Sequence, residues 1–150
     1  LMPFKIGDLA GFHVADALPG RAIMLSDAPD DHGDESANNP PNARMFIAAQ
    51  SGGPEEAGDR ENFARVAFDQ IVGIKEVHVQ DAEPLRISNQ PGYQTLAKAK
   101  DAQTGSDVMV VQWLRFGTGG FIRMIGMART DGWVETYNRL RTVRDSIETN

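Results

Sequence analysis

Two arginines interrupt strongly apolar stretches on either side of one turn. Arg115 and Arg123 flank Thr118-Gly119-Gly120, and the length of that turn decides whether they lie on opposite faces or directly opposite one another. In the second arrangement, the two guanidinium groups repel each other unless a carboxylate or an anionic ligand lies between them. With Trp113 and Gln112 beside them, they form a candidate anion-binding cleft.

The alternative for these arginines is structural. Each can pair with one of the protein's own acids, such as Asp101 or Asp107, and then no external ligand is needed. The sequence leaves both interpretations open, and it identifies Trp113, Arg115 and Arg123 as the ligand-binding candidates.

An acidic segment at residues 27–35 is a second candidate site. It reads DAPDDHGDE, and hard divalent cations bind where several carboxylate oxygens converge around a flexible glycine. The spacing does not match an EF-hand, which needs a glycine at position six and a glutamate at position twelve. The alternative is a solvated surface loop, because residues 27–42 contain three prolines and almost no apolar side chains.

No arrangement typical of an enzyme is present in the sequence. The chain has no cysteine, which excludes thiol catalysis, disulfides and thiolate metal sites. No GxSxG or HExxH pattern occurs, and we expect no catalytic residues, no metal and no cofactor. The weakest of three functional hypotheses is an enzyme with a dispersed acid/base pair, His78 with Asp81 or Glu83. The other histidines, His13 and His32, are scattered singly.

Composition and charge restrict the class of partner. The net charge of −6 disfavours nucleic acid or an anionic membrane as the principal partner, and no apolar run approaches the ~20 residues of a membrane helix. Charge is uneven along the chain: residues 26–61 hold nine carboxylates and two arginines, whereas residues 115–144 hold six arginines and two carboxylates. If these segments lie apart in space, the molecule is dipolar.

The elements that position the candidate residues follow from the apolar pattern. Residues 107–129 predict two strands joined by a tight turn, and Gly117-Thr118-Gly119-Gly120 matches such a turn better than a phosphate-binding loop. Both faces of the first strand are apolar, which predicts a sheet that is covered on both sides. Further strands are expected at residues 4–6, 11–14, 21–25, 44–50, 74–88 and 93–100, and helices at 59–71 and 131–148.

This order of strands, helix, antiparallel meander and helix predicts an α+β fold in a single domain spanning residues 1–150. Asp59 is expected to cap the first helix. Phe63, Val66, Ala67 and Ile71 are expected to form its buried stripe.

The C-terminal half resembles the Mog1/PsbP-like superfamily. The resemblance rests on ISNQPGY at 87–93, VMVVQWLRF at 108–116, GGFIRMIGMA at 119–128 and a closing helix ending in VRDSI at 143–147. At the N-terminus, GFHV at 11–14 with Pro19-Gly20 is similar to the opening strand pair of that family. The resemblance implies a three-layer α/β/α sandwich around an antiparallel meander sheet, and members that are mainly non-catalytic.

The leading functional hypothesis is therefore a non-catalytic accessory or binding protein of bacterial origin that acts by protein–protein contact. The alternative is a protein that binds a small-molecule anion or a divalent cation. We expect a periplasmic or other extracytoplasmic location, with the cytoplasm as the alternative. That expectation rests on the start at Leu1 rather than at an initiator methionine, although a chain trimmed for other reasons starts in the same way. The partner and the oligomeric state do not follow from the sequence.

Overall fold

The computed structural model describes residues 2–33 and 41–150, and its centre is a seven-stranded antiparallel sheet. The strand order is β2-β3-β4-β8-β7-β6-β5, so β5 to β8 form a meander whose last strand pairs with β4. The predicted antiparallel α+β architecture is confirmed. The strands are β2 His13–Leu18, β3 Ala22–Ser26, β4 Ala43–Ser51, β5 Ile74–Ile87, β6 Gln90–Asp101, β7 Asp107–Gly117 and β8 Gly120–Arg129.

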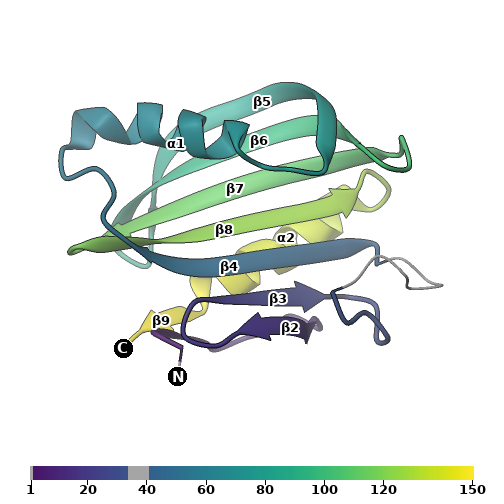
Figure 1. Cartoon of the computed structure of the whole chain (residues 1–150), viewed down its shortest axis with the longest axis horizontal. Helices are drawn as coiled ribbons and strands as arrows, with labels where there is room; N and C mark the ends of the chain where they lie inside the picture. The colour runs from purple at the N-terminus through teal and green to yellow at the C-terminus, as the bar shows by residue number, and fades with distance from the viewer. Residues whose placement is uncertain (1, 34–40) are drawn as a thin grey trace.

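One helix covers each face of this sheet (Figure 1). Helix α1, Arg60–Asp69, follows the 3-10 turn η1, Ala57–Asp59, and lies on what we call the α1 face. Helix α2, Trp133–Asp145, lies on the opposite α2 face, beside a small sheet in which β1, Phe4–Ile6, pairs with β9, Ile147–Thr149. These layers confirm the predicted α/β/α sandwich.

Strand β7 is buried on both faces, as its sequence predicts. Val111 and Trp113 point to the α2 face, whereas Val110 and Leu114 point to the α1 face, and all four side chains are fully buried. A strand with two apolar faces is stable only where both layers are present, so β7 fixes the positions of the two helices.

The turn between β7 and β8 contains two residues, Thr118 and Gly119. Gly119 has a φ of 75°, which glycine adopts without steric cost, and the turn interpretation is confirmed. With a two-residue turn, Arg115 pairs with Ile122 and Leu114 pairs with Arg123. The two arginines therefore lie on opposite faces of the sheet.

Helix α1 packs on the sheet through Ala64, Ala67 and Phe68, which are buried. Two details of the prediction were wrong. Asp59 occupies the N-cap position, as predicted, but its side chain makes no capping hydrogen bond. Val66 is 45% exposed, since the buried stripe runs through the alanines on the neighbouring side.

Helix α2 buries Leu140 and Val143 on the α2 face and ends at Asp145, earlier than expected. The residues that follow, Ile147–Thr149, pair with β1 and so adopt an extended conformation. Gly126 of β8 lies directly under the helix. A Cβ atom there would approach Leu140 Cδ1 to 2.8 Å, so the lack of a side chain allows α2 to pack closely on the sheet.

The two helices leave part of the α1 face open. Helix α1 packs on β6 and β7, whereas no helix of the described residues lies in front of β3 and β4 (Figure 1). Met24 of β3 and Phe46 of β4 are only partly buried. Within residues 2–33 and 41–150, no helix is long and apolar enough to cross a membrane.

Candidate functional site

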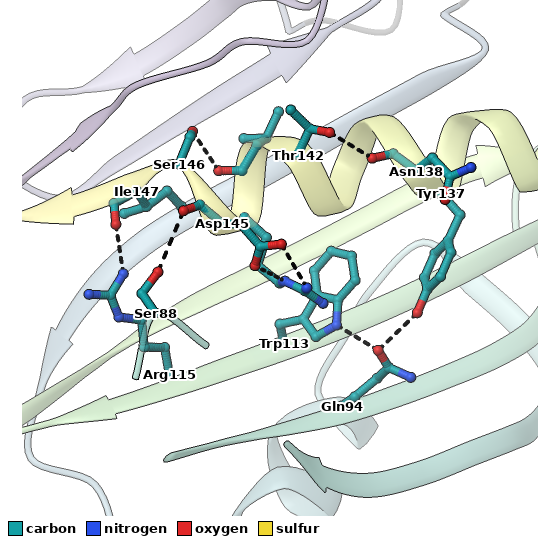
Figure 2. Close-up of polar contacts among 12 residues, drawn as sticks. Ser88, Gln94, Trp113, Arg115, Tyr137, Asn138, Thr142, Asp145, Ser146 and Ile147 are labelled. Atoms are coloured by element: carbon teal, nitrogen blue, oxygen red, sulfur yellow. Dashed lines mark hydrogen bonds and ion pairs between the residues drawn. The ribbon is translucent and has the colours of Figure 1, made fainter. Parts of the chain in front are cut away.

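Trp113 lies beneath α2 in a network of polar and aromatic contacts. Its Nε1 donates to Gln94 Oε1 at 2.8 Å, and the Tyr137 hydroxyl donates to the same oxygen at 2.9 Å (Figure 2). The guanidinium carbon of Arg144 lies 4.8 Å from the centre of the Trp113 ring. Trp113 is fully buried, so this network fastens α2 to the sheet and leaves no exposed indole surface.

Arg115 lies on the same α2 face and is 6% exposed. Its Nε donates to Gln90 Oε1 at 2.6 Å and its Nη1 donates to the Ile147 carbonyl at 2.7 Å, which ties β9 to the sheet (Figure 2). No acid pairs with it among the described residues, and Nη2 has no hydrogen-bond partner among them. Burial lowers the pKa of the Arg115 guanidinium from its usual value.

Arg123 lies on the α1 face, at the end of α1. Its Nη2 donates to the Ala67 carbonyl at 2.6 Å and its Nε donates to Gln112 Oε1 at 3.1 Å, while Gln112 Nε2 donates to the Ala64 carbonyl at 3.1 Å. A cation at the C-terminal end of a helix is favoured by the helix dipole. Burial lowers the pKa of the Arg123 guanidinium as well.

The acids expected to pair with these arginines do not do so. Asp107 pairs with Lys100 at 2.8 Å, and Asp101 accepts from backbone N–H groups of the turn between β6 and β7. The extended strand separates Asp107 from Arg115 by roughly 26 Å. The three candidates therefore do not form one site: Trp113 and Arg115 share a face, and Arg123 lies on the other.

In the described part of the acidic segment, residues 27–33, Ala28 and Asp31 are buried, whereas Asp30 and His32 are exposed to solvent. Asp31 is fully buried, and Arg44 binds both of its carboxylate oxygens at 2.7 Å. This ion pair holds the pKa of Asp31 well below its usual value. Asp27 accepts from the backbone N–H groups of residues 42 and 43.

These contacts occupy carboxylate oxygens that a cation would need. Among residues 2–33 and 41–150, no three histidine or acidic side chains converge on a metal position, and Asp34 and Glu35 lie outside the described residues. Divalent-cation binding by segment 27–35 stays a prediction.

The histidines and the proposed acid/base pair lie apart from any enclosed site. His78 is exposed on the edge strand β5, opposite Lys98, and Asp81 accepts a hydrogen bond from Gln94 Nε2 at 2.8 Å. Glu83 is also exposed. His13 contacts the carbonyl of Asp31 at 3.4 Å. The geometry gives His78 no carboxylate partner among the described residues.

An open groove lies on the uncovered part of the α1 face. It has a volume of about 670 Å³ and opens broadly to solvent. Strands β3 and β4 form its floor, with the ends of β2 and β8 and the flank of α1 beside them. We call it the α1-side groove, and it is lined by Leu18, Arg21, Ala22, Phe46, residues 48–51, Gly53, Phe63 and Phe121.

Aromatic side chains shape the groove next to α1. Phe63 of α1 and Phe121 of β8 contact each other edge to face, with ring centres 5.1 Å apart. Phe46 is partly buried, and Leu18 at the opposite edge is 56% exposed. The surface of the groove is mixed, with these apolar side chains next to Arg21, Gln50 and Ser51.

Sequence reasoning did not identify this groove. Its lining residues come from β2, β3, β4, α1 and β8, which are far apart in the chain, and only the strand order brings them together. One signal was available in the sequence. Residues 44–50 carry apolar side chains on both faces of the strand and need cover on both, while the sequence offers only two helices. Of the predicted candidates, only Arg123 lies near the groove, opposite Ala48.

Comparison with known proteins identifies the fold. No protein-family model matches the sequence, and no curated protein matches it. Among solved structures, LpqN of Mycobacterium tuberculosis, involved in cell envelope biogenesis, is 11% identical with a TM-score of 0.66 over 98% of this chain and 83% of LpqN. Cyanobacterial PsbP of Synechocystis is 12% identical with a TM-score of 0.61, over 99% of this chain and 87% of that one.

The Ran-binding protein Mog1p of Saccharomyces cerevisiae is also similar. It is 8% identical with a TM-score of 0.60, over 98% of this chain and 90% of Mog1p. At such identities the likeness concerns the fold alone, and it confirms the Mog1/PsbP-like fold expected from the sequence.

Proposed function

We propose that this protein is a non-catalytic binding protein that acts by contact with another protein, and that the α1-side groove is the contact surface. The observation that carries the proposal is the open groove between α1 and β2, with the partly exposed Phe46 and the exposed Leu18. Small-molecule pockets enclose most of their ligand, whereas an open groove suits a segment of a larger partner.

The residues that line the groove support binding and not catalysis. Among the described residues they include aromatic and aliphatic side chains, one arginine and the polar residues Gln50 and Ser51, but no histidine and no carboxylate. General acid–base chemistry needs a titratable group within reach of the substrate. The groove therefore offers a surface for recognition without the groups that would transfer a proton.

Descriptions of the similar structures agree with a binding or accessory role. One is a Ran-binding protein, and another takes part in cell envelope biogenesis. We extend that role, and an extracytoplasmic location, to this chain as part of the proposal.

The test is capture of a partner by matched variants of the whole chain. Leu18→Glu places a charge in the groove at an exposed position, and Val134→Glu does the same on the outer surface of α2, where Val134 is 75% exposed. We expect wild type and Val134→Glu to retain the same saturable partner and Leu18→Glu to lose it. Equal retention by both variants contradicts the proposed surface.

A second candidate function is anion binding at Arg115. The observation that favours it is a nearly buried guanidinium group that contacts only neutral oxygens among the described residues and has Nη2 without a partner there. Acetate and inorganic phosphate should then raise the melting temperature of wild type but not of Arg115→Gln. Equal responses of the two proteins would exclude an anion site at Arg115.

A further inference from the structure

We infer that the segment bound in the α1-side groove carries a carboxylate side chain among its apolar residues, and that Arg21 recognises this carboxylate. The inference rests on the proposed function and specifies the chemistry of the partner. It follows from the position of one guanidinium group in the lining of the groove and a second one beside it, since the described residues of the lining include no acid.

Arg21 provides the exposed charge. It lies in the lining of the groove where the chain passes from β2 to β3, and its backbone is fixed by two hydrogen bonds, from Arg21 N to the Leu18 carbonyl and from Ala49 N to the Arg21 carbonyl. Its side chain has no hydrogen bond or ion pair within the described residues. The anchored backbone thus holds an available guanidinium group at the edge of the apolar surface.

Arg123 lies beside the groove, outside its lining, and adds a more buried positive charge. It pairs across the sheet with Ala48, which lines the groove, and it lies two residues from Phe121 on the same face of β8. Nε and Nη2 hold Gln112 and the end of α1, while Nη1 has no hydrogen-bond partner in the described residues. Burial without a neighbouring carboxylate lowers the pKa of this guanidinium, so an incoming carboxylate would stabilise its charged form.

The local charge contrasts with that of the whole chain. The protein carries a net charge of −6, yet the described part of the groove lining contains a cation and no anion. Complementary charge determines which partner binds and in what register more than it determines affinity. A segment with apolar anchors and a suitably placed Asp or Glu matches both properties of the groove.

The shape of the groove favours a peptide segment over a free amphiphile. A fatty acid has the same chemistry, an apolar chain and a carboxylate, but such ligands are usually enclosed on most sides. This groove is broad and open, and its floor is a sheet surface on which a segment with alternating side chains can place several anchors.

Selection from random twelve-residue peptides, displayed on phage and panned on the intact chain, tests the inference. Enriched peptides are synthesised with a fluorescent label and titrated by fluorescence anisotropy against wild type, Leu18→Glu, Arg21→Glu and Arg141→Glu. Arg141 is exposed on α2, away from the groove, and controls for the change in net charge. Dodecanoate is the competing small amphiphile.

We expect the enriched peptides to combine apolar residues with Asp or Glu. Arg21→Glu should weaken their binding by about tenfold or more, and Arg141→Glu by less than about twofold. Replacing the peptide carboxylate by its amide should remove the effect of Arg21→Glu.

The contrary outcomes separate the inference from the proposed function. Enriched peptides that are neutral or basic, and whose binding is lost in Leu18→Glu but unchanged in Arg21→Glu, would refute the carboxylate requirement. The groove would then remain the contact surface. If the peptides bind Leu18→Glu as tightly as wild type, or if no peptide is enriched, both the inference and the proposed function are wrong. If dodecanoate binds the groove more tightly than every peptide, the inferred ligand is an amphiphile and not a peptide segment.

Discussion

Replacement of Asp31 by asparagine tests how the edge of the open face is held. Asp31 is fully buried, accepts from Arg44 at 2.7 Å on each oxygen, and accepts from Gly33 N at 2.9 Å. Removing one partner of a buried ion pair costs about 3–5 kcal/mol. The Arg44 side chain is 28% exposed, so water can replace part of the interaction, and we expect a loss of about 3 kcal/mol at pH 7.

The dependence on pH follows from the direction of the pKa shift. The pKa of Asp31 is lowered in the folded state from its usual value of 3.8, so the folded protein binds the proton less readily than the unfolded chain does. The stabilisation is complete well above pH 3.8 and is lost as the pH falls below 3.8 toward the folded pKa. The difference in stability between wild type and Asp31→Asn should therefore shrink between pH 5 and pH 2.5.

Urea unfolding followed by tryptophan fluorescence measures this difference, because Trp113 is fully buried in the folded state. Asp107→Asn is the matched control, since Asp107 belongs to an exposed pair with Lys100 and should have little effect. A loss for Asp31→Asn no larger than that of the control, or one that does not change between pH 5 and pH 2.5, would refute the role of the buried pair.

Two further predictions concern the packing of α2, and a third concerns the ligand sites. Gln94→Leu leaves the buried N–H of Trp113 and the hydroxyl of Tyr137 without their acceptor. It should lower the free energy of unfolding in urea by about 1–3 kcal/mol. An unchanged midpoint would show that the network does not contribute to stability. Gly126→Ala places a methyl group 2.8 Å from Leu140 Cδ1 and should lower stability by about 1–3 kcal/mol, and a stabilised variant would contradict the close packing of α2 on the sheet. Because internal contacts occupy the acidic segment, Ca²⁺ and Mg²⁺ should not raise the melting temperature in a thermal-shift series that also includes acetate and phosphate. A reproducible rise in melting temperature with Ca²⁺ would support the cation hypothesis.

Local pattern was sufficient to predict the centre of the fold. The apolar residues on both faces of 107–117 and the glycine-containing turn at 117–120 predict the hairpin, its double cover and hence the layers. The ends of elements were less predictable. Residues 147–149 continue the helical pattern, but pairing with β1 at the other end of the chain makes them a strand.

The candidate site depended on information that no local pattern contains. Whether Arg115 and Arg123 meet depends on one residue more or less in a turn, and the two-residue turn separates them. The acidic segment looked solvated because Asp31 is surrounded by polar residues in sequence, whereas Arg44, thirteen residues away, makes it a buried anchor. The groove exists because α1 covers only part of its face of the sheet, which depends on strand order and not on composition.

The most direct test of the central claim is an NMR titration of the ¹⁵N-labelled chain with the tightest peptide or the captured partner. We predict that chemical-shift changes cluster at Leu18, Arg21, Ala48, Gln50 and Phe121, the residues that line the α1-side groove. Backbone amides around Val134 and Arg141 on α2 should stay unchanged. Changes that cluster on α2 or along the edge strand β5, with the groove unaffected, would contradict the claim that the open half of the α1 face is the binding surface.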